Sequence, residues 1–346
     1  MKALTFHGPG RRYWADVPDP VLQDTEDALI RVDAVTICGT DLHILRGDVP
    51  TCEAGRVLGH EAVGTVEEVG AGVRRVQPGD RVLISCISAC ARCRYCREGR
   101  YGQCLGGGGW VLGHRIDGTQ AERVRVPFAD TSTYALPEQV PDEAALMLAD
   151  ILPTAYEVGV RAGQVAPGDT VVIVGAGPIG LAAVLTAHLF SPSRVVVVDP
   201  AAARRDAAKA LGADLVLDPG DDVEAIVREH TDGLGADVAI EAVGIPESFE
   251  LCTRLVRPAG RVANVGVHGA AATLHLEQLW DNDITITTGL VDTVSTPTLL
   301  AMLANRRLDV GSFITHRFGL DEIQDAYDVF SRPSETGALK VALFRH

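Results

Sequence analysis

The spacing of apolar residues changes near residue 150, and this change predicts two domains. Upstream, short runs with alternating apolar residues predict β-strands, as in ALIRVDAV (28–35), AVGTVEEVG (62–70) and DRVLIS (80–85). Turn signals separate such runs, among them Pro78-Gly79-Asp80 and the glycines at 106–109. This part of the chain is typical of a partly open β-barrel with loops.

Downstream, strongly apolar runs alternate with helical patterns. The runs that predict strands are TVVIVG (170–175), RVVVVD (194–199), ADLVLD (213–218), ADVAIEAVG (236–244), GRVANVGV (260–267) and ITITTGLV (284–291). Helical patterns occupy 200–212 and 222–230. Because buried strands that alternate with helices form parallel sheets covered on both faces, we expect an α/β fold. The tail, 313–346, predicts a helix and a final strand that returns to the first domain.

Length, charge and hydropathy narrow the function. A chain of 346 residues with 47% apolar residues can bury two cores. The formal net charge of −15 disfavours nucleic acid as a partner, since phosphate binding needs clustered Lys and Arg. The stretch 170–193 is uncharged, but its glycines and Pro178 predict a strand, a turn and a buried helix rather than a membrane span. The first residues lack the apolar run of a secretory signal, so we expect a cytoplasmic protein.

The segment VVIVGAGPIG predicts a dinucleotide-binding turn in the pattern Gly-x-Gly-x-x-Gly. Its first glycine permits the tight turn, its second lets the backbone approach a pyrophosphate, and its third lets helix and strand pack closely. Asp199 ends the next strand, 19 residues after Gly180, where a carboxylate accepts hydrogen bonds from ribose hydroxyls and repels a 2′-phosphate. We therefore expect NAD rather than NADP; a helix cap at Asp199 is the alternative. The residues expected to bind the cofactor here are Gly175, Gly177, Pro178, Ile179, Gly180 and Asp199.

Four cysteines lie within fifteen residues: Cys90, Cys93, Cys96 and Cys104. In a reducing compartment such clusters are more often metal ligands than disulfides. Four thiolates around a tetrahedral Zn²⁺ leave no position for a substrate, so we expect a structural zinc lobe at about 86–110. Ordinary thiols and an iron–sulfur cluster are the alternatives, although the gap of seven residues before Cys104 does not fit the bacterial ferredoxin pattern.

A second group of candidate ligands lies in ICGTDLH (37–43) and LGHEAVG (58–64). Catalytic zinc needs about three protein ligands and one open position, and Cys38 and His60 qualify as two of them. The pattern Gly59-His60-Glu61-x2-Gly64-x5-Gly70-x2-Val73 resembles the signature of zinc-dependent medium-chain alcohol dehydrogenases. The cysteine cluster resembles that family's structural-zinc lobe, and the glycine turn resembles its cofactor domain. The resemblance covers essentially the whole chain.

The resemblance implies a GroES-like catalytic domain over 1–150 and 291–346, and a Rossmann NAD-binding domain over 151–290. It also implies Cys38 and His60 as catalytic-zinc ligands, with Glu61 behind them and able to approach the metal. Where many members have a second cysteine, this sequence offers Asp150 in LADILPT, as in bacterial secondary-alcohol dehydrogenases and formaldehyde dehydrogenases. The alternatives for this third ligand are Cys52, Cys86 and Cys252.

The chemistry implied by the resemblance is reversible, NAD-dependent oxidation of a secondary or primary alcohol to a ketone or aldehyde. Thr40 would accept the alcohol proton, and His43 would pass it towards solvent. The alternatives are a helix N-cap at Thr40 and a surface histidine at His43. Thr154 would pack on the nicotinamide ring, and Trp110 would line the substrate pocket or anchor a loop. The backbone expected to hold the nicotinamide carboxamide is that of Val265, Gly266, Val267 and Leu290.

Related activities compete with this interpretation. A formaldehyde or other aldehyde dehydrogenase of the same superfamily is the runner-up, followed by a polyol or threonine dehydrogenase. A non-catalytic nucleotide sensor is a different class, but such a protein would be expected to lose its metal ligands or Thr40. Since the family forms dimers and tetramers, we expect a homo-oligomer, with a tetramer favoured.

Overall fold

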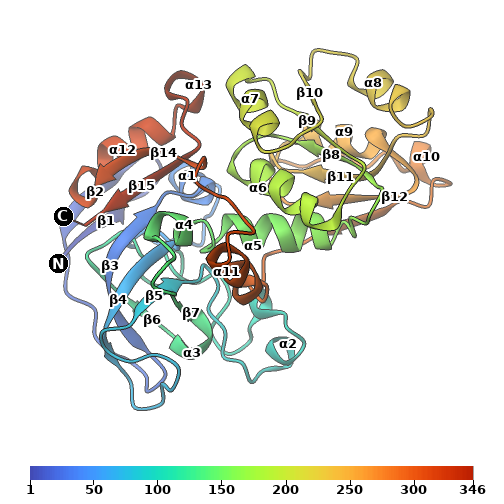
Figure 1. Ribbon diagram of the computed structural model, residues 1–346. Helices are drawn as coiled ribbons and strands as arrows, with labels where there is room; N and C mark the ends of the chain where they lie inside the picture. The colour runs from blue at the N-terminus through green and yellow to red at the C-terminus, as the bar shows by residue number, and fades with distance from the viewer. Residues whose placement is uncertain (346) are drawn as a thin grey trace. The chain divides into compact units, whose positions relative to one another are not determined.

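In the computed structural model, which describes residues 1–345, the chain folds into two units (Figure 1). Unit 1 comprises Met1–Asp150 and Val291–His346, and unit 2 comprises Ile151–Leu290.

Unit 1 is built around a mainly antiparallel sheet in the order β14-β15-β3-β4-β5-β7, with β6 also paired to β3. These strands are β3 (Ala28–Thr36), β4 (Ala62–Val69), β5 (Arg81–Ile84), β6 (Arg123–Val126), β7 (Thr133–Ala135), β14 (Ile314–Gly319) and β15 (Lys340–Phe344). The predicted strands at 28–35, 62–70 and 80–85 are therefore found. Alternate residues of β3 face the core, which explains the alternating pattern of its sequence. A separate hairpin-like pair, β1 (Lys2–Phe6) and β2 (Arg12–Asp16), completes the strands of this unit.

Short helices connect these strands. They are α1 (Gly39–Arg46), α2 (Arg94–Arg97), α3 (Ala129–Ser132), α4 (Asp142–Leu146), α11 (Thr296–Ala304), α12 (Ile323–Phe330) and α13 (Pro333–Thr336), with 3₁₀ turns at Tyr101–Gln103 and Leu320–Glu322. The tail returns to the first domain as predicted: β15 pairs with β3, and α12 packs beside β15 (Figure 1). The edge strand β14 was not predicted. It is half exposed, so its sequence carries little apolar alternation.

Unit 2 is a wholly parallel sheet in the order β10-β9-β8-β11-β12-β13. Its strands are β8 (Thr170–Val174), β9 (Arg194–Val198), β10 (Leu215–Leu217), β11 (Ala236–Glu241), β12 (Val256–Asn264) and β13 (Thr285–Thr288). Numbered from β8, this is the 3-2-1-4-5-6 order of Rossmann folds, as predicted. The order reverses between β8 and β11, and ligands of such sheets bind beyond the carboxyl ends of the strands at this switch point.

Helices of unit 2 follow most of the strands. They are α5 (Ile151–Thr154), α6 (Pro178–Ala187), α7 (Ala202–Ala210), α8 (Val223–Glu229), α9 (Pro246–Leu255) and α10 (Leu276–Leu279), with a π-helical segment at Ala155–Arg161 and a 3₁₀ turn at His188–Phe190. The uncharged stretch 170–193 forms β8, the glycine turn and α6, as expected. No helix in the described part of the chain has the length and apolar character that a membrane span requires.

Candidate active site and metal centres

Four ligand atoms of unit 1 converge on one buried point. The Cys38 Sγ lies 3.5 Å from Asp150 Oδ2, and His60 Nε2 lies 3.4 Å from the same oxygen. One ligand atom each from Cys38, His60, Asp150 and Glu61 all lie within 4.8 Å of one another. Cys38 precedes α1, His60 and Glu61 precede β4, and Asp150 ends the segment after α4, so the sheet brings distant segments together. The structure thus brings together the residues that the resemblance implied as zinc ligands.

The spacing of these donors fits a tetrahedral zinc ion. In a tetrahedron the ligands are separated by about 1.63 times the metal–ligand distance, so donors about 2.0–2.3 Å from zinc lie roughly 3.3–3.8 Å apart. The two separations measured from Asp150 Oδ2 fall in this range. A set of one sulfur, one imidazole nitrogen and carboxylate oxygen also suits zinc chemically.

The electrostatics of the cluster also favour a cation. Burial, together with the neighbouring Asp150 and Glu61, raises the pKa of the Cys38 thiol. Burial likewise raises the pKa of Glu61 to about 7, although Lys340 partly opposes this rise. These anions are therefore costly in the protein alone, and a divalent cation would offset that cost.

Polar groups behind the ligands orient them. Asp41 Oδ1 lies 3.7 Å from His60 Nδ1, and neither atom has a hydrogen-bond partner among the described residues. The other oxygen of Asp41 accepts a hydrogen bond of 2.9 Å from the backbone N–H of Cys38. Lys340 Nζ donates to Glu61 Oε2 and to the Ile37 carbonyl, and both members of this ion pair are 1% exposed.

Thr40 and His43 lie on α1, next to the ligand cluster. Cys38 is the N-cap of this helix and Thr40 lies within its first turn, so the alternative interpretation of Thr40 as the N-cap is wrong. The Thr40 hydroxyl is 3.5 Å from Cys38 Sγ. His43 Nδ1 is 2.8 Å from Asp48 Oδ2, and the His43 side chain is 20% exposed. His43 therefore combines a carboxylate partner with access to solvent.

Trp110 also lies beside the candidate ligands. Its ring meets that of His60 edge-on, with centroids 6.1 Å apart, and stacks on His114 at 4.3 Å. His114 is anchored in turn by Thr51, whose hydroxyl lies 2.7 Å from His114 Nε2. Trp110 thus packs against two histidine rings at the edge of the cluster, which fits a wall of the substrate pocket and also a loop anchor.

The second candidate metal centre is the lobe that holds Cys90, Cys93, Cys96 and Cys104, whose sulfur atoms lie within 4.8 Å of one another. Cys90 Sγ and Cys96 Sγ are 3.9 Å apart, close to the roughly 3.75 Å expected between thiolates on one zinc ion. The Cys93 sulfur accepts hydrogen bonds from the backbone N–H groups of Cys96 and Leu105, which lower the pKa of its thiol to about 6. None of the four forms a disulfide. Backbone N–H groups therefore favour the thiolate at Cys93, and also at Cys104, whereas burial raises the pKa of the Cys96 thiol.

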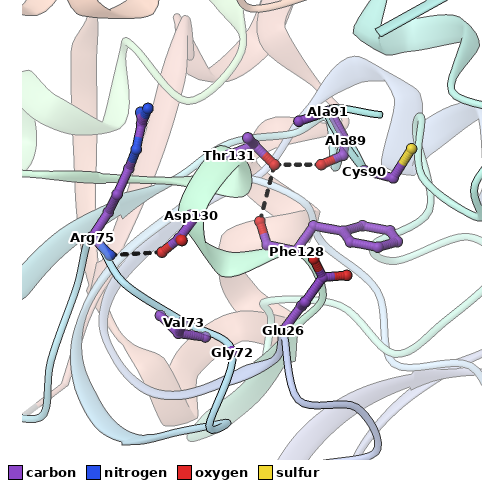
Figure 2. Close-up of a pocket in the computed structure, with 10 residues that line it drawn as sticks. All are labelled: Glu26, Gly72, Val73, Arg75, Ala89, Cys90, Ala91, Phe128, Asp130 and Thr131. Carbon is purple, nitrogen blue, oxygen red and sulfur yellow. Dashed lines mark hydrogen bonds between the residues drawn. The ribbon is translucent and has the colours of Figure 1, made fainter. Parts of the chain in front are cut away.

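A hollow in unit 1 lies on one side of this lobe. Figure 2 shows it between Cys90, Phe128 and Glu26, with Asp130 accepting a hydrogen bond of 2.7 Å from the backbone N–H of Arg75. None of the residues that line it belongs to the Cys38 cluster. The hollow is therefore separate from the candidate reaction centre.

The glycine turn of unit 2 has the geometry that a pyrophosphate needs. Gly175 follows β8 with φ of +100°, and a Cβ at Gly180 would lie 1.8 Å from the Gly175 carbonyl oxygen. A Cβ at Gly177, the N-cap of α6, would meet nothing within 4 Å. The first and third glycines are thus required by the fold itself, whereas the second leaves open space where a ligand can approach the helix N-terminus.

Asp199 lies directly beside this turn. Its Oδ2 accepts a hydrogen bond of 2.8 Å from the Ala176 N–H, and its Oδ1 accepts one of 2.8 Å from the Ala201 N–H. The N-cap of α7 is Ala201, so Asp199 is not the cap of that helix. Because a carboxylate has about four acceptor positions, these two bonds leave capacity for ribose hydroxyls.

The other predicted cofactor residues are spread over unit 2. Thr154 ends α5, whereas 265–267 follow β12 at the carboxyl edge of the sheet. Val267 is 50% exposed and Leu290 is 43% exposed, so both leave apolar surface for a ligand. Next to the switch point, the buried Glu241 accepts hydrogen bonds from the N–H groups of Val243 and Gly244 and holds the loop after β11.

Sequence reasoning missed the residues that support these sites. They are Asp41, Gln120, Glu241, Tyr327 and Lys340, all buried. For two of them, the sequence contains a feature that could have indicated a buried charge. Lys340 is the lone cation in the apolar run ALKVALF, and Glu241 ends the apolar run ADVAIE. A charge inside a buried strand requires a partner, and this could have marked both.

Comparison with known proteins agrees with this architecture. Residues 24–138 match the family described as alcohol dehydrogenase GroES-like domain, and residues 178–305 match the family described as zinc-binding dehydrogenase. An alcohol dehydrogenase from Cupriavidus necator is 36% identical over 366 residues, covering 100% of this chain and 99% of the relative.

Solved structures show the same likeness. Zinc-dependent alcohol dehydrogenase 2 from Streptococcus pneumoniae, in its apo form, superposes with a TM-score of 0.96 at 47% identity, covering 100% of this chain and 98% of that one. A zinc-binding dehydrogenase from Sinorhizobium meliloti bound to NADP has a TM-score of 0.87 at 30% identity, covering 99% and 98% of the two chains. The fold and family expected from the sequence are confirmed, and the chain belongs to the zinc-dependent medium-chain alcohol dehydrogenases.

Proposed function

We propose that this protein, an oxidoreductase of alcohols and carbonyl compounds, works with one catalytic zinc ion, one structural zinc ion and NAD. The observation that carries the proposal is the convergence of Cys38, His60 and Asp150 at separations that match a tetrahedral ion. Cys90, Cys93, Cys96 and Cys104 would hold the structural ion. The expected reaction is the reversible oxidation of a secondary or primary alcohol.

The residues of the chain have separate tasks in this reaction. Cys38, His60 and Asp150 would hold the catalytic ion, and Glu61 is close enough to approach it. When bound, zinc supplies a Lewis acid that lowers the pKa of an alcohol hydroxyl. Thr40 Oγ1, next to Cys38 Sγ, would accept the proton of that hydroxyl, and His43 would pass it to solvent.

The choice of NAD rests on Asp199. Its buried carboxylate lies beside the glycine turn, where it would accept hydrogen bonds from the adenosine ribose and repel a 2′-phosphate. NAD bound here would supply the hydride acceptor of the reaction. Arg204 Nη1 lies 3.8 Å from Asp199 Oδ2 and is thereby engaged with the carboxylate, which supports NAD over NADP.

The test compares Cys38→Ser with Cys52→Ser as a matched control. Cys52 is also buried in unit 1 but lies outside the cluster. We expect Cys38→Ser to lose one of two zinc ions per chain, measured by elemental analysis, and to lose alcohol-dependent reduction of NAD. Cys52→Ser should keep both. Loss of one ion with undiminished turnover would show that the Cys38 cluster is not the reaction centre.

The same assay separates the competing activities. Ranking kcat/KM for primary alcohols, secondary alcohols, polyols and formaldehyde, each with NAD and with NADP, identifies the substrate class and the cofactor. Formaldehyde as the best substrate would favour the runner-up activity.

We also propose a homo-oligomer, with a tetramer favoured. Strand β13 is an edge of the parallel sheet, and an unpaired edge is a template for pairing with another chain. In the chain segment just before it, Leu276 is 61% exposed and Trp280 is 77% exposed. Large exposed apolar side chains are enriched in subunit interfaces.

A further inference from the structure

Three buried side chains connect α12 to the first turn of α1. The Tyr327 hydroxyl donates a hydrogen bond of 2.8 Å to Gln120 Oε1, and Gln120 Nε2 donates one of 3.0 Å to Asp41 Oδ2. All three side chains are 0–1% exposed. We call Tyr327, Gln120 and Asp41 the Tyr327 relay.

The hydrogen bonds of the Tyr327 relay fix the orientation of the Gln120 side-chain amide. Asp41 Oδ2 accepts from both the Cys38 N–H and Gln120 Nε2, so the amide nitrogen of Gln120 must face the carboxylate and its oxygen must face Tyr327. Burial raises the pKa of the Tyr327 hydroxyl, which therefore keeps its proton and remains a donor. Both ends of the Gln120 amide are thus fixed, and with them the rotation of the Asp41 carboxylate.

The relay ends at the candidate metal ligand His60. With Oδ2 of Asp41 engaged, Oδ1 is left facing His60 Nδ1 at 3.7 Å, and neither atom has another partner among the described residues. That distance is longer than a hydrogen bond, but a small movement of either buried side chain would bring the two atoms into hydrogen-bond range. A proton held on Nδ1 leaves the lone pair on Nε2, the atom that faces Cys38 and Asp150.

Backbone packing links Gln120 to His60 a second time. Gly59, which precedes His60, has φ of +93°, and a Cβ there would lie 2.5 Å from Gln120 Cγ. The Gln120 N–H also donates to the Leu58 carbonyl at 2.9 Å. Gln120 therefore touches both the carboxylate that faces His60 and the turn that carries it.

We propose that Gln120 and Tyr327 are positioning residues of the catalytic metal site, which act by holding Asp41 against His60. Neither touches substrate, cofactor or metal. A metal-binding histidine usually donates its second nitrogen to a carboxylate, and loss of such a partner costs roughly 10–100-fold in metal affinity. The proposal rests on the proposed function, because it requires that the Cys38 cluster bind a metal.

The test is Tyr327→Phe, which removes only the hydroxyl that fixes Gln120. We expect the metal that depends on Cys38 to bind roughly 10-fold more weakly in competition with a chelator, while the ion of the cysteine lobe is retained. With cobalt in place of zinc, we expect the visible absorption bands of the Cys38 site to shift. Tyr134→Phe is the matched control, since it also removes one hydroxyl that donates within unit 1, to Thr293.

A double-mutant cycle with Asp41→Asn decides whether the effect passes through Asp41. If it does, Tyr327→Phe changes cobalt affinity in the native background but not in the Asp41→Asn background. Additive effects, or unchanged cobalt bands in Tyr327→Phe, would overturn the proposal. If Tyr327→Phe fails to fold, Gln120→Met removes both relay bonds and is judged by the same measurements. Absence of any Cys38-dependent metal in the native protein would instead refute the proposed function.

Discussion

At the scale of single residues, we expect the buried ion pair between Lys340 and Glu61 to affect the free energy of unfolding more than an exposed pair does. Both side chains are 1% exposed, and Glu61 Oε1 has no hydrogen-bond partner among the described residues. Breaking a buried pair leaves an uncompensated charge, at a cost of about 3–5 kcal/mol. An exposed pair such as Lys2 with Asp16 contributes little to stability, because water screens the attraction between its charges.

We therefore expect Lys340→Met to be strongly destabilising and Lys2→Met to be nearly neutral. For a unit of this size, a loss of about 3–5 kcal/mol lowers the melting temperature by about 10 °C. Adding Glu61→Gln to Lys340→Met should restore part of this loss, because the unpaired charge is removed. Differential scanning calorimetry of the native protein, the two single variants and the double variant measures both effects. Equal melting temperatures for Lys340→Met and Lys2→Met would show that the buried pair has no special importance.

Residues with a local role could be predicted from a short pattern, and the distant candidate ligands Cys38, His60 and Asp150 through the family resemblance. The residues that support those ligands through long-range contacts could not be predicted. The roles expected of Gly175, Gly177 and Gly180 depend on contacts within one short turn. The local pattern alone therefore predicts a dinucleotide-binding turn. Asp41 and Gln120 are 79 positions apart and Gln120 and Tyr327 are 207 apart. Nothing in the local sequence indicates that these side chains meet, because the sheet of unit 1 determines their contact.

At the scale of elements, the cysteine lobe has little packing of its own, so the proposed zinc ion would supply much of its stability. Its only helix, α2, has four residues, and the lobe buries few apolar side chains besides its cysteines. In the proposed zinc-bound protein, metal binding would contribute folding free energy that the lobe itself lacks. The exposed Arg92, Arg94, Arg97 and Arg100 give trypsin four cleavage sites once the lobe unfolds.

We expect Cys104→Ser to increase tryptic cleavage between 92 and 100 by at least roughly 10-fold, since the lobe would open locally without its metal. Cys252→Ser, which alters a buried cysteine of unit 2, should leave cleavage in the lobe unchanged. Chelation of the native protein should reproduce the effect of Cys104→Ser. Mass spectrometry of the fragments locates the cuts. A Cys104→Ser lobe that resists trypsin as well as the native lobe would mean that packing alone maintains it.

Elements differ in how well the sequence predicts them, and burial explains the difference. The strand β8 is buried along its whole length, so its apolar run is unmistakable. The edge strand β14 alternates between buried and exposed positions and includes His316 and Arg317, so only its pairing with β15 makes it a strand. The helix α9 begins with Pro246 at its first position, a start signal that is clear once the preceding strand is placed.

At the scale of the whole molecule, the exposed apolar side chains of the segment before β13 bear on the proposed oligomer. A net charge of −15 favours solubility through repulsion between molecules. Exposed apolar side chains such as Leu276 and Trp280 favour association instead, and the proposed oligomer would bury them between subunits. Trp280 is the most exposed of the large hydrophobic side chains, which makes it the best position for a test.

We expect Trp280→Glu to dissociate the oligomer, because a carboxylate at the interface would have to be buried without a partner. Sedimentation velocity should then show a species close to the chain mass of 36.7 kDa, whereas the native protein sediments as a multiple of it. Leu234→Glu is the control, since Leu234 is 61% exposed and lies before β11, away from the β13 edge in the sequence of strands. A native protein that sediments as a monomer would refute the oligomer. Dissociation by both variants would instead trace the effect to added charge, since an interface at this edge would respond only to Trp280→Glu.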